Sequence, residues 1–422
     1  MVYVLSKNGQ PIMPTENHAK VRLLLKSGKA TVVKRTPFTI RLTGASKTYT
    51  QEITLGVDAG SKHVGLSATT EKKELFVAEL RPRNDVTELM SSRLEMRRSR
   101  RNRTTRYRKP RFDNRVHSKH KGWLAPSVEV KIWNHIQGIR LVAKILPITT
   151  IRVETAEFDP QRLKAMEAGE PLPVGTDYQL GEQYDHYNVR QYVLHRDGYA
   201  CQCCGAHSTP KKEVRLHVHH LESRKTGGDA PDNLITLCED CHKGYHAGKV
   251  QLPAGKRRRK STRDASFMGI MRETLMERLK TIFSGIKVCS TYGYITKYWR
   301  EKKDIAKTHT SDAFVVAKNL DAECLGKSLM IVPKRQHNRQ IHKCKINRGG
   351  VRKLNQAPKY MFGFQLFDRV RYKKQEWFIV GRRAKGYFKI SKINEPKVFA
   401  EVSCKKLKHL ESRKPLLVLY CA

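Results

Sequence analysis

The chain has 422 residues, of which 83 are Lys or Arg and 39 are Asp or Glu, and its formal net charge is +44. At 39% hydrophobic residues it can bury a core, which excludes wholesale disorder, and its length predicts two to four domains. Because this charge cannot be balanced within the chain, the expected partner is a polyanion, with a basic membrane-surface protein as the alternative. The sequence shows no apolar run of about 18 residues and no amino-terminal signal pattern, so we expect a soluble, cytoplasmic protein without a membrane partner.

The first part of the chain predicts short strands followed by a strongly basic helix. Residues 1–50 alternate β-like runs with turn residues, and "EITLGVDAGSKHVGLSA" predicts a strand, a turn and a second strand. From Val86 the apolar residues recur with helical spacing. Between Arg93 and Lys121 there are thirteen Lys or Arg and two acids. A second amphipathic helix is predicted at 128–150, before a strand in "TTIRVETAEF".

The second part begins with a Gly/Pro-bearing connector and a Cys/His module near 186–250. A basic linker, "GKRRRKSTR", precedes a helix with one apolar face, a strand in "KVCSTYGYITKYW" and a helix in "SDAFVVAKNL". The last ~95 residues are β-like, with aromatic residues interleaved among Lys and Arg, and predict a small β-rich domain.

Two C-x2-C pairs, Cys201/Cys204 and Cys238/Cys241, predict one structural Zn²⁺ site, because two such turns place four thiolates tetrahedrally. The alternative is a set of buried free cysteines. Cys203 is expected to be a bystander, since a ligand there would lose the x2 spacing. The gap of 33 residues between the pairs is longer than in a simple zinc ribbon, so further structure is expected within it.

That gap and its flanks contain "HVHH" at 217–220, Asn233 in "PDNLITLC", and "CHKGYH" at 241–246. With "RDGYACQCCG", residues 190–248 resemble the HNH (ββα-metal) endonucleases. The resemblance implies that His220 is the general base and that Asn233 braces its loop. An imidazole with a pKa near ~6.5 suits base work at neutral pH.

The same resemblance implies one Mg²⁺ ion in the HNH module, held against the scissile phosphate by His219 and His242. His246 is the alternative second ligand. Many family members have Asp where this chain has His219, so a metal contact by this histidine is an inference. His217 is expected to be a surface or packing residue.

Three carboxylates lie far apart in the sequence: Asp58 and Glu154 at strand ends, and Asp312 at a helix start, with His309 three residues before it. Taken singly, each of these acids is interpreted most simply as a turn residue or a helix cap. Together they resemble the RuvC branch of the RNase H-like fold, which implies that the three acids hold two Mg²⁺ ions for phosphodiester hydrolysis and that His309 assists. Glu157 is the alternative to Glu154.

A RuvC core in three pieces, a basic helix and an inserted HNH module make a layout that resembles the IscB family, transposon-associated relatives of type II CRISPR effector nucleases. "PIMP" at 11–14 resembles the "PLMP" motif of that family. The fold class is therefore α/β multidomain: an RNase H-like (RuvC) core split in three, an inserted HNH domain with zinc knuckles, and a small β-rich C-terminal domain. The expected boundaries are 1–50 (PLMP-like), 51–85 (RuvC part I), 86–121 (bridge helix), 122–160 (RuvC part II), 161–185 (linker), 186–250 (HNH), 251–264 (basic linker), 265–326 (RuvC part III) and 327–422 (RNA and target-adjacent-motif interaction).

The family resemblance implies an RNA-guided DNA endonuclease. Its partners would be a large structured guide RNA and double-stranded target DNA, and the protein would be a monomer within the ribonucleoprotein. HNH would cleave the guide-paired strand and RuvC the displaced strand. The bridge helix would bind RNA phosphates, through Arg93, Arg97, Arg98, Arg100, Arg101, Arg103 and Arg106. The alternatives are an RNA-independent HNH DNA endonuclease of homing or restriction type, and a non-catalytic nucleic-acid-binding protein.

Overall fold

The computed structural model describes residues 1–101, 120–155, 159–184, 186–210, 212–223, 228–252, 263–335, 337, 358–393 and 395–421. The chain divides into two compact units: a large unit of Met1–Phe158 with Met271–Ala422, and a small unit of Asp159–Ile270. Glu157, Arg103, Arg106 and the basic run 256–260 lie outside the described residues.

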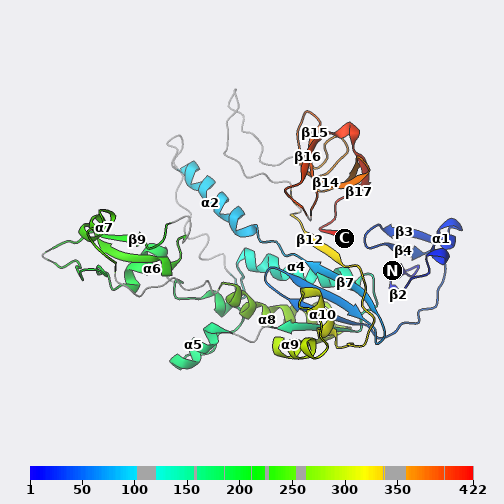
Figure 1. Cartoon of the computed structure of the whole chain (residues 1–422), viewed down its shortest axis with the longest axis horizontal. Helices are drawn as coiled ribbons and strands as arrows, with labels where there is room; N and C mark the ends of the chain where they lie inside the picture. Colours follow the sequence, from blue (N-terminus) through cyan, green and yellow to red (C-terminus); the bar gives the residue numbers. More distant parts are fainter. Residues whose placement is uncertain are drawn as a thin grey trace. The chain divides into compact units, whose positions relative to one another are not determined.

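A seven-stranded mixed sheet forms the centre of the large unit (Figure 1). Its order is β11-β8-β5-β6-β7-β12-β18. β5, β6 and β7 are antiparallel neighbours, whereas β8 runs parallel to both β5 and β11. The strands are β5 (Thr54–Ala59), β6 (Val64–Thr69), β7 (Glu74–Leu80), β8 (Thr150–Thr155), β11 (Lys287–Tyr292), β12 (Leu329–Pro333) and β18 (Leu416–Tyr420).

Helices cover both faces of this sheet, which is why its central strands are almost continuously buried. Helix α4 (Pro126–Ala143) packs on β6 and β7, where Gly138 faces the side chains of Leu66 and Leu80. Helix α10 (His309–Ala317) packs on the opposite face, against Gly56 of β5 and Gly65 of β6. A Cβ atom on Gly65 would lie 1.7 Å from the carbonyl oxygen of His309, so glycine permits this close approach.

The amino-terminal segment is a separate four-stranded sheet of order β2-β1-β4-β3. The same segment also contains a helix, α1, which the alternating β-like pattern did not predict. The side chain of Asn17 caps α1 by accepting a hydrogen bond from the backbone amide of Lys20. The elements are β1 (Val2–Leu5), β2 (Pro11–Thr15), α1 (His18–Lys26), β3 (Ala30–Lys34) and β4 (Thr39–Leu42).

The last part of the chain belongs to two sheets, which corrects the expected single region 327–422. β12 and β18 pair with each other and extend the large sheet beyond β7. The part of the sequence between β12 and β18 contains a five-stranded antiparallel sheet of order β16-β15-β14-β13-β17, which is packed around Trp377 and Phe388. Its strands are β13 (Arg369–Tyr372), β14 (Gln375–Arg382), β15 (Tyr387–Ser391), β16 (Phe399–Ser403) and β17 (Lys408–Glu411), with the short 3-10 helix η3 at Cys404–Lys406.

Three further helices complete the description of this half of the molecule. Helix α2 (Val86–Arg101) is the described part of the basic helix, and α8 (Arg263–Ile282) buries Phe267, Met271, Leu275 and Leu279 as predicted. The strand predicted through Trp299 is wrong beyond Tyr292, because Gly293–Lys302 forms helix α9.

The small unit contains the Cys/His module. In this module helix α6 is followed by an antiparallel hairpin of strands β9 and β10 and then by helix α7. Within the hairpin, His219 of β9 pairs with Ile235 of β10. The connector predicted at 161–185 is more ordered than expected, because α5 (Pro160–Ala168) is capped by Asp159. The other elements are η1 (Gly175–Gln179), α6 (Val189–Arg196), β9 (Leu216–His220), η2 (Pro231–Asn233), β10 (Leu234–Cys238) and α7 (Glu239–His246).

None of the helices in the described ranges combines the length and the apolar character needed to cross a membrane.

Candidate active sites and metal centres

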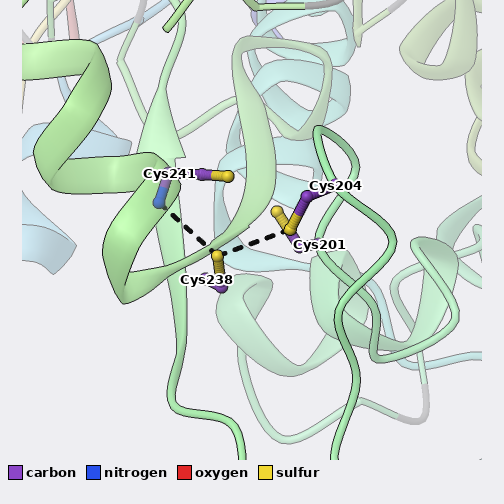
Figure 2. A group of neighbouring side chains, drawn as sticks. All are labelled: Cys201, Cys204, Cys238 and Cys241. Atoms are coloured by element: carbon purple, nitrogen blue, oxygen red, sulfur yellow. Dashed lines mark hydrogen bonds between the residues drawn. The ribbon is translucent and has the colours of Figure 1, made fainter. Parts of the chain in front are cut away.

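Four cysteine side chains of the small unit turn their sulfur atoms toward one another (Figure 2). Cys201 and Cys204 lie in the loop after α6, Cys238 ends β10, and Cys241 lies in the first turn of α7. Their sulfurs all lie within 4.8 Å of one another. Burial raises the pKa of Cys241, and its contacts with the other three sulfurs raise it further, so four thiolates need a cation between them. This donor set fits the Zn²⁺ ion that the spacing predicts.

Cys203 lies outside this set, with its sulfur 3.8 Å from the carbonyl oxygen of Gln251. It is therefore a natural control for the four cluster cysteines.

A second cluster consists of His219, His242 and His246, whose ring nitrogens also lie within 4.8 Å of one another. His242 and His246 are four residues apart on α7 and so share one face of the helix, which presents both to His219 on β9. Burial lowers the pKa of His219 to about 4, and the neighbouring His242 and His246 add to this effect. The imidazole of His219 is therefore neutral at neutral pH, the form that binds a metal ion.

Both candidates for the second ligand, His242 and His246, thus belong to one three-histidine set. Three imidazoles suit a transition ion such as Zn²⁺, whereas Mg²⁺ prefers oxygen donors. The Mg²⁺ ion expected here from the family resemblance does not match this donor set. His217 stacks on the ring of His242, with centroids 5.2 Å apart and planes 14° apart, so it packs beside the cluster.

His220 follows His219 on β9, so its side chain points to the opposite face of the strand. Its Nε2 lies 3.0 Å from Oδ1 of Asp229. A carboxylate in this position orients an imidazole. Sequence reasoning missed Asp229; the available signal is an acid nine residues after His220, within the same loop.

Asn233 is completely buried and holds the loop that follows His220. Its Oδ1 accepts from the amide of Glu222 at 2.8 Å, and its Nδ2 donates to the carbonyl oxygens of Glu222 and Gly228 at 3.1 and 2.9 Å. These bonds tie together the two sides of the loop, close to His220 and Asp229.

The large unit brings three predicted acids to one end of its sheet. Asp58 and Glu154 are register partners on the parallel strands β5 and β8, and Asp312 lies in the first turn of α10. His309, the first residue of α10, places Nδ1 2.6 Å from Oδ2 of Asp58, and this hydrogen bond raises the pKa of His309.

Burial raises the pKa of Glu154 to about 6, and the charges of Asp58 and Asp312 add to it, although a contact from Thr296 acts the other way. Within the described residues, Oε2 of Glu154 is buried without a hydrogen-bond partner. Arg300 lies beside the three acids, with its Nε 3.0 Å from Oδ1 of Asp312. These oxygens suit hard cations such as Mg²⁺. However, in the part of the chain that the structure describes, the acids do not form a set with all ligand atoms within 4.8 Å.

Two residues beside this site were missed. The ring of His63 stacks on that of His309, with centroids 5.1 Å apart and planes 5° apart, and its Nδ1 lies 2.8 Å from Oε1 of Glu79. The sequence signal for His63 is its place in the turn after Asp58. Glu79 lies on β7, and no sequence signal marks it as part of this site.

The basic helix is described as far as Arg101, and Arg93 and Arg98 are exposed on it while Arg97 is half-buried. The backbone of Arg100 and Arg101 is helical. The run Arg97–Arg101 reads "RRSRR".

Comparison with protein families gives two matches: residues 201–248 match the HNH endonuclease model, and residues 2–181 match the model described as RRXRR protein. The chain carries an HNH endonuclease domain, preceded by an RRXRR domain. The HNH endonuclease domain expected from the resemblance of residues 190–248 is thereby confirmed. The HNH match contains all four cysteines and the three-histidine set.

Individual relatives were also found. A stretch of 70 residues is 30% identical to anaredoxin of Nostoc sp. strain PCC 7120; it makes up 16% of this chain and 86% of that protein, and it places this stretch in the same family as anaredoxin. The chain is also similar to Streptococcus thermophilus Cas9 in complex with AGGA PAM (13% identity, TM-score 0.30, 46% of this chain and 26% of that chain) and to the Type II-C Cas9 of Actinomyces naeslundii (12% identity, TM-score 0.23, 63% and 59%). The chain therefore spans less than two thirds of these structures, and TM-scores this low do not establish a shared fold.

Proposed function

We propose that the chain is an RNA-guided DNA endonuclease with two separate cutting centres. The observation that carries the proposal is the presence of two chemically different sites in one strongly basic chain. The HNH domain has a histidine base next to a three-histidine cluster, and the large unit has paired carboxylates at a sheet end. The charge of +44 and the arginine-rich helix support a nucleic-acid partner.

In the HNH domain, His220 would take a proton from the attacking water, and Asp229 would hold the imidazole and stabilise its protonated form. Asn233 would keep His220 and Asp229 in register by fixing the loop between them. His219, His242 and His246 would hold the metal ion, which supplies charge stabilisation at the scissile phosphate. We assign the guide-paired strand to this centre.

In the large unit, Asp58, Glu154 and Asp312 would hold Mg²⁺, which stabilises negative charge on the displaced strand's phosphate. His309 would hold Asp58 in place through its 2.6 Å hydrogen bond and lie next to the reacting phosphate. The expected RuvC-like core fits the order in which β5, β6, β7, β8 and β11 lie in the sheet. The residues 1–50, the helix from Val86 and the region between β12 and β18 would bind guide RNA.

Strand-specific end labelling of a guide-matched duplex tests the proposal. His220→Ala should leave the paired strand uncut, since loss of a general base costs about 10²–10⁴ in rate. Asp58→Ala should leave the displaced strand uncut. His207→Ala and Asp321→Ala are matched controls, because these exposed residues lie outside both sites.

Either active-site variant that stops cleavage of both strands, while guided binding persists, would contradict two independent centres. Cleavage without a matched guide, by protein that carries no RNA on purification, would instead favour an HNH endonuclease of homing or restriction type. Sequencing the RNA that copurifies with the chain identifies the guide.

A further inference from the structure

A cavity of about 330 Å³ lies in the large unit. It is lined by residues from the end of β3, from the last turns of α4, from the first strands of the five-stranded sheet, and from the segment that joins β17 to β18. Four stretches distant in the sequence therefore meet around one space. None of the acids or histidines assigned above lines it.

The lining of the cavity is strongly cationic. Six Lys or Arg side chains line the cavity against one carboxylate, Glu411; the six are Lys34, Arg140, Lys144, Arg369, Arg413 and Lys414. Glu411 is already engaged, with Oε1 2.6 Å from Nζ of Lys414. Arg369 is also paired, with Nη1 3.6 Å from Oε2 of Glu376 and 3.9 Å from Oε2 of Glu411, so among the described residues the excess positive charge lies on the other cations of the lining.

Lys34 shows the consequence of this imbalance most directly. Among the described residues its ammonium group has no ion-pair partner, and burial lowers its pKa to about 8, with Lys414 and Lys144 adding to the effect. A lysine held partly buried beside two like charges is unfavourable unless an anion joins them. Because a phosphate accepts from several ammonium groups at once, it is the anion that this arrangement suits.

The rest of the lining is largely apolar and aromatic. Phe367 and Phe378 line the cavity together with Leu141 and the chain from Pro415 to Val418. The guanidinium of Arg369 lies 5.3 Å from the ring centroid of Phe378 and donates to Oγ1 of Thr36 at 2.9 Å. Phe378 is therefore a buried ring covered by a buried cation, whereas Phe367 is half-buried.

We propose that this cavity binds one nucleotide, with its phosphate among Lys34, Lys144 and Lys414 and its base against Phe367 and the apolar lining. The cavity volume of about 330 Å³ lies at the lower end of the range of ~300–1,000 Å³ for small-ligand sites. This volume suits one nucleotide rather than a duplex. An isolated phosphate would leave the apolar lining without a ligand contact, whereas an apolar peptide side chain would leave the excess cations unpaired. Unpaired RNA nucleotides are bound in this way, by stacking on aromatic rings with charge at the backbone.

The inference goes beyond the proposed cleavage, because it requires neither cutting centre. The nucleotide is either an unpaired residue of the bound RNA or a free nucleotide, and both have the same chemistry. The test therefore measures binding alone, in the full chain.

The probes are AMP, adenosine, inorganic phosphate and a short single-stranded RNA carrying 4-thiouridine for cross-linking. The test variant is Lys34→Met with Lys144→Met, which keeps the stems and removes two charges. Lys385→Met with Lys397→Met is the matched control, since these exposed lysines lie outside the cavity. The unfolding temperature of the test variant should equal or exceed that of the wild type, because a partly buried, unpaired cation is removed.

The wild type and the control should bind AMP or the RNA at least about tenfold more tightly than the test variant, since two charge-assisted contacts are lost. Cross-links should map to Phe367 or to the peptide 411–418. AMP binding with no cross-link would assign the site to a free nucleotide, and a cross-link without AMP binding to a nucleotide of RNA; both support the proposal. Unchanged binding in a folded test variant, or phosphate binding as tight as that of AMP, would overturn it.

Discussion

The two candidate metal regions of this chain differ in how far apart their donors lie in the sequence. The four thiols and three imidazoles of the two HNH clusters lie between Cys201 and His246, on one hairpin, one helix and one loop. In the large unit, Asp58 and His309 meet although they are 251 residues apart. The first site is therefore built by local spacing, whereas the second depends on strand register and on how closely α10 packs on the sheet.

The two regions also differ in charge. Burial lowers the pKa of His219 and of His242, so these two imidazoles can lie close together in the neutral form without a cation. Carboxylates repel one another, which is why Asp58 and Asp312 add to the raised pKa of Glu154. The histidine site is thus close to a binding geometry by itself, whereas the carboxylate site needs a cation to complete it.

The largest effect on stability is expected when one of the four cluster cysteines is replaced. Cys204→Ser or Cys241→Ser should release one Zn²⁺ per chain and unfold the HNH domain, since zinc binding contributes about 10–16 kcal/mol of apparent free energy in small zinc-dependent units. Elemental analysis and circular dichroism measure the two effects.

Cys203→Ser is the control for that experiment and should keep its zinc, because Cys203 lies outside the cluster. Asp58→Ala should keep it as well, since the two regions are built independently. Wild-type protein without zinc would contradict the assignment of the four cysteines.

A second, smaller effect tests the packing that forms the carboxylate site. Gly65→Ala should lower the free energy of unfolding by about 2–4 kcal/mol, because its Cβ would lie 1.7 Å from the carbonyl oxygen of His309. Gly326→Ala should change it by less than about 0.5 kcal/mol, because this exposed position has open space around it. Equal stability of the two variants in thermal unfolding would show that α10 does not pack so closely.

This contrast explains what the sequence could predict. The C-x2-C pairs are a local pattern, so they indicated the zinc cluster directly, and the motifs around them lie close enough in the sequence to carry the resemblance to HNH endonucleases. Asp58, Glu154 and Asp312 are ordinary strand-end and helix-start residues, and only the resemblance to a known layout linked them. Their partners His63 and Glu79 were missed because neither spacing nor composition encodes a ring stack between distant segments.

The fold errors have the same origin. The residues 293–299 are rich in Tyr, Ile and Trp, which favour strands, but they form the helix α9, where tertiary packing outweighs propensity. β12 and β18 were assigned to the terminal domain because the sequence does not specify the pairing partner of a strand. In the structure β12 runs parallel to β7 and pairs with β18 on its other side.

A third prediction concerns donor chemistry. His219→Asp should shift the ion preference of the HNH domain toward Mg²⁺, because one imidazole is replaced by a carboxylate. We expect binding of a transition ion to weaken by about 10–100-fold, as measured by calorimetric titration of the full chain with Co²⁺ and Mg²⁺. His207→Ala is the control and should bind both ions as the wild type does. An unchanged preference in the His219 variant would remove this histidine from the ligand set.

The smallest effect is expected at His63, which touches the carboxylate site only through His309. His63→Ala removes both the ring stack and the contact with Glu79, whereas His63→Phe keeps a ring and loses the contact. An aromatic pair contributes about 0.5–1.5 kcal/mol, which corresponds to roughly a two- to tenfold change in rate. We therefore expect displaced-strand cleavage to slow by that amount in His63→Ala and to recover partly in His63→Phe.

Paired-strand cleavage by either His63 variant should equal that of the wild type, because the HNH domain contains none of these residues. Recovery with phenylalanine would show that the stack positions His309, whereas equal loss in both variants would assign the effect to Glu79. A variant that slows both strands equally would contradict the separation of the two regions, since His63 lies beside the carboxylates and distant in sequence from every thiol and imidazole of the HNH domain.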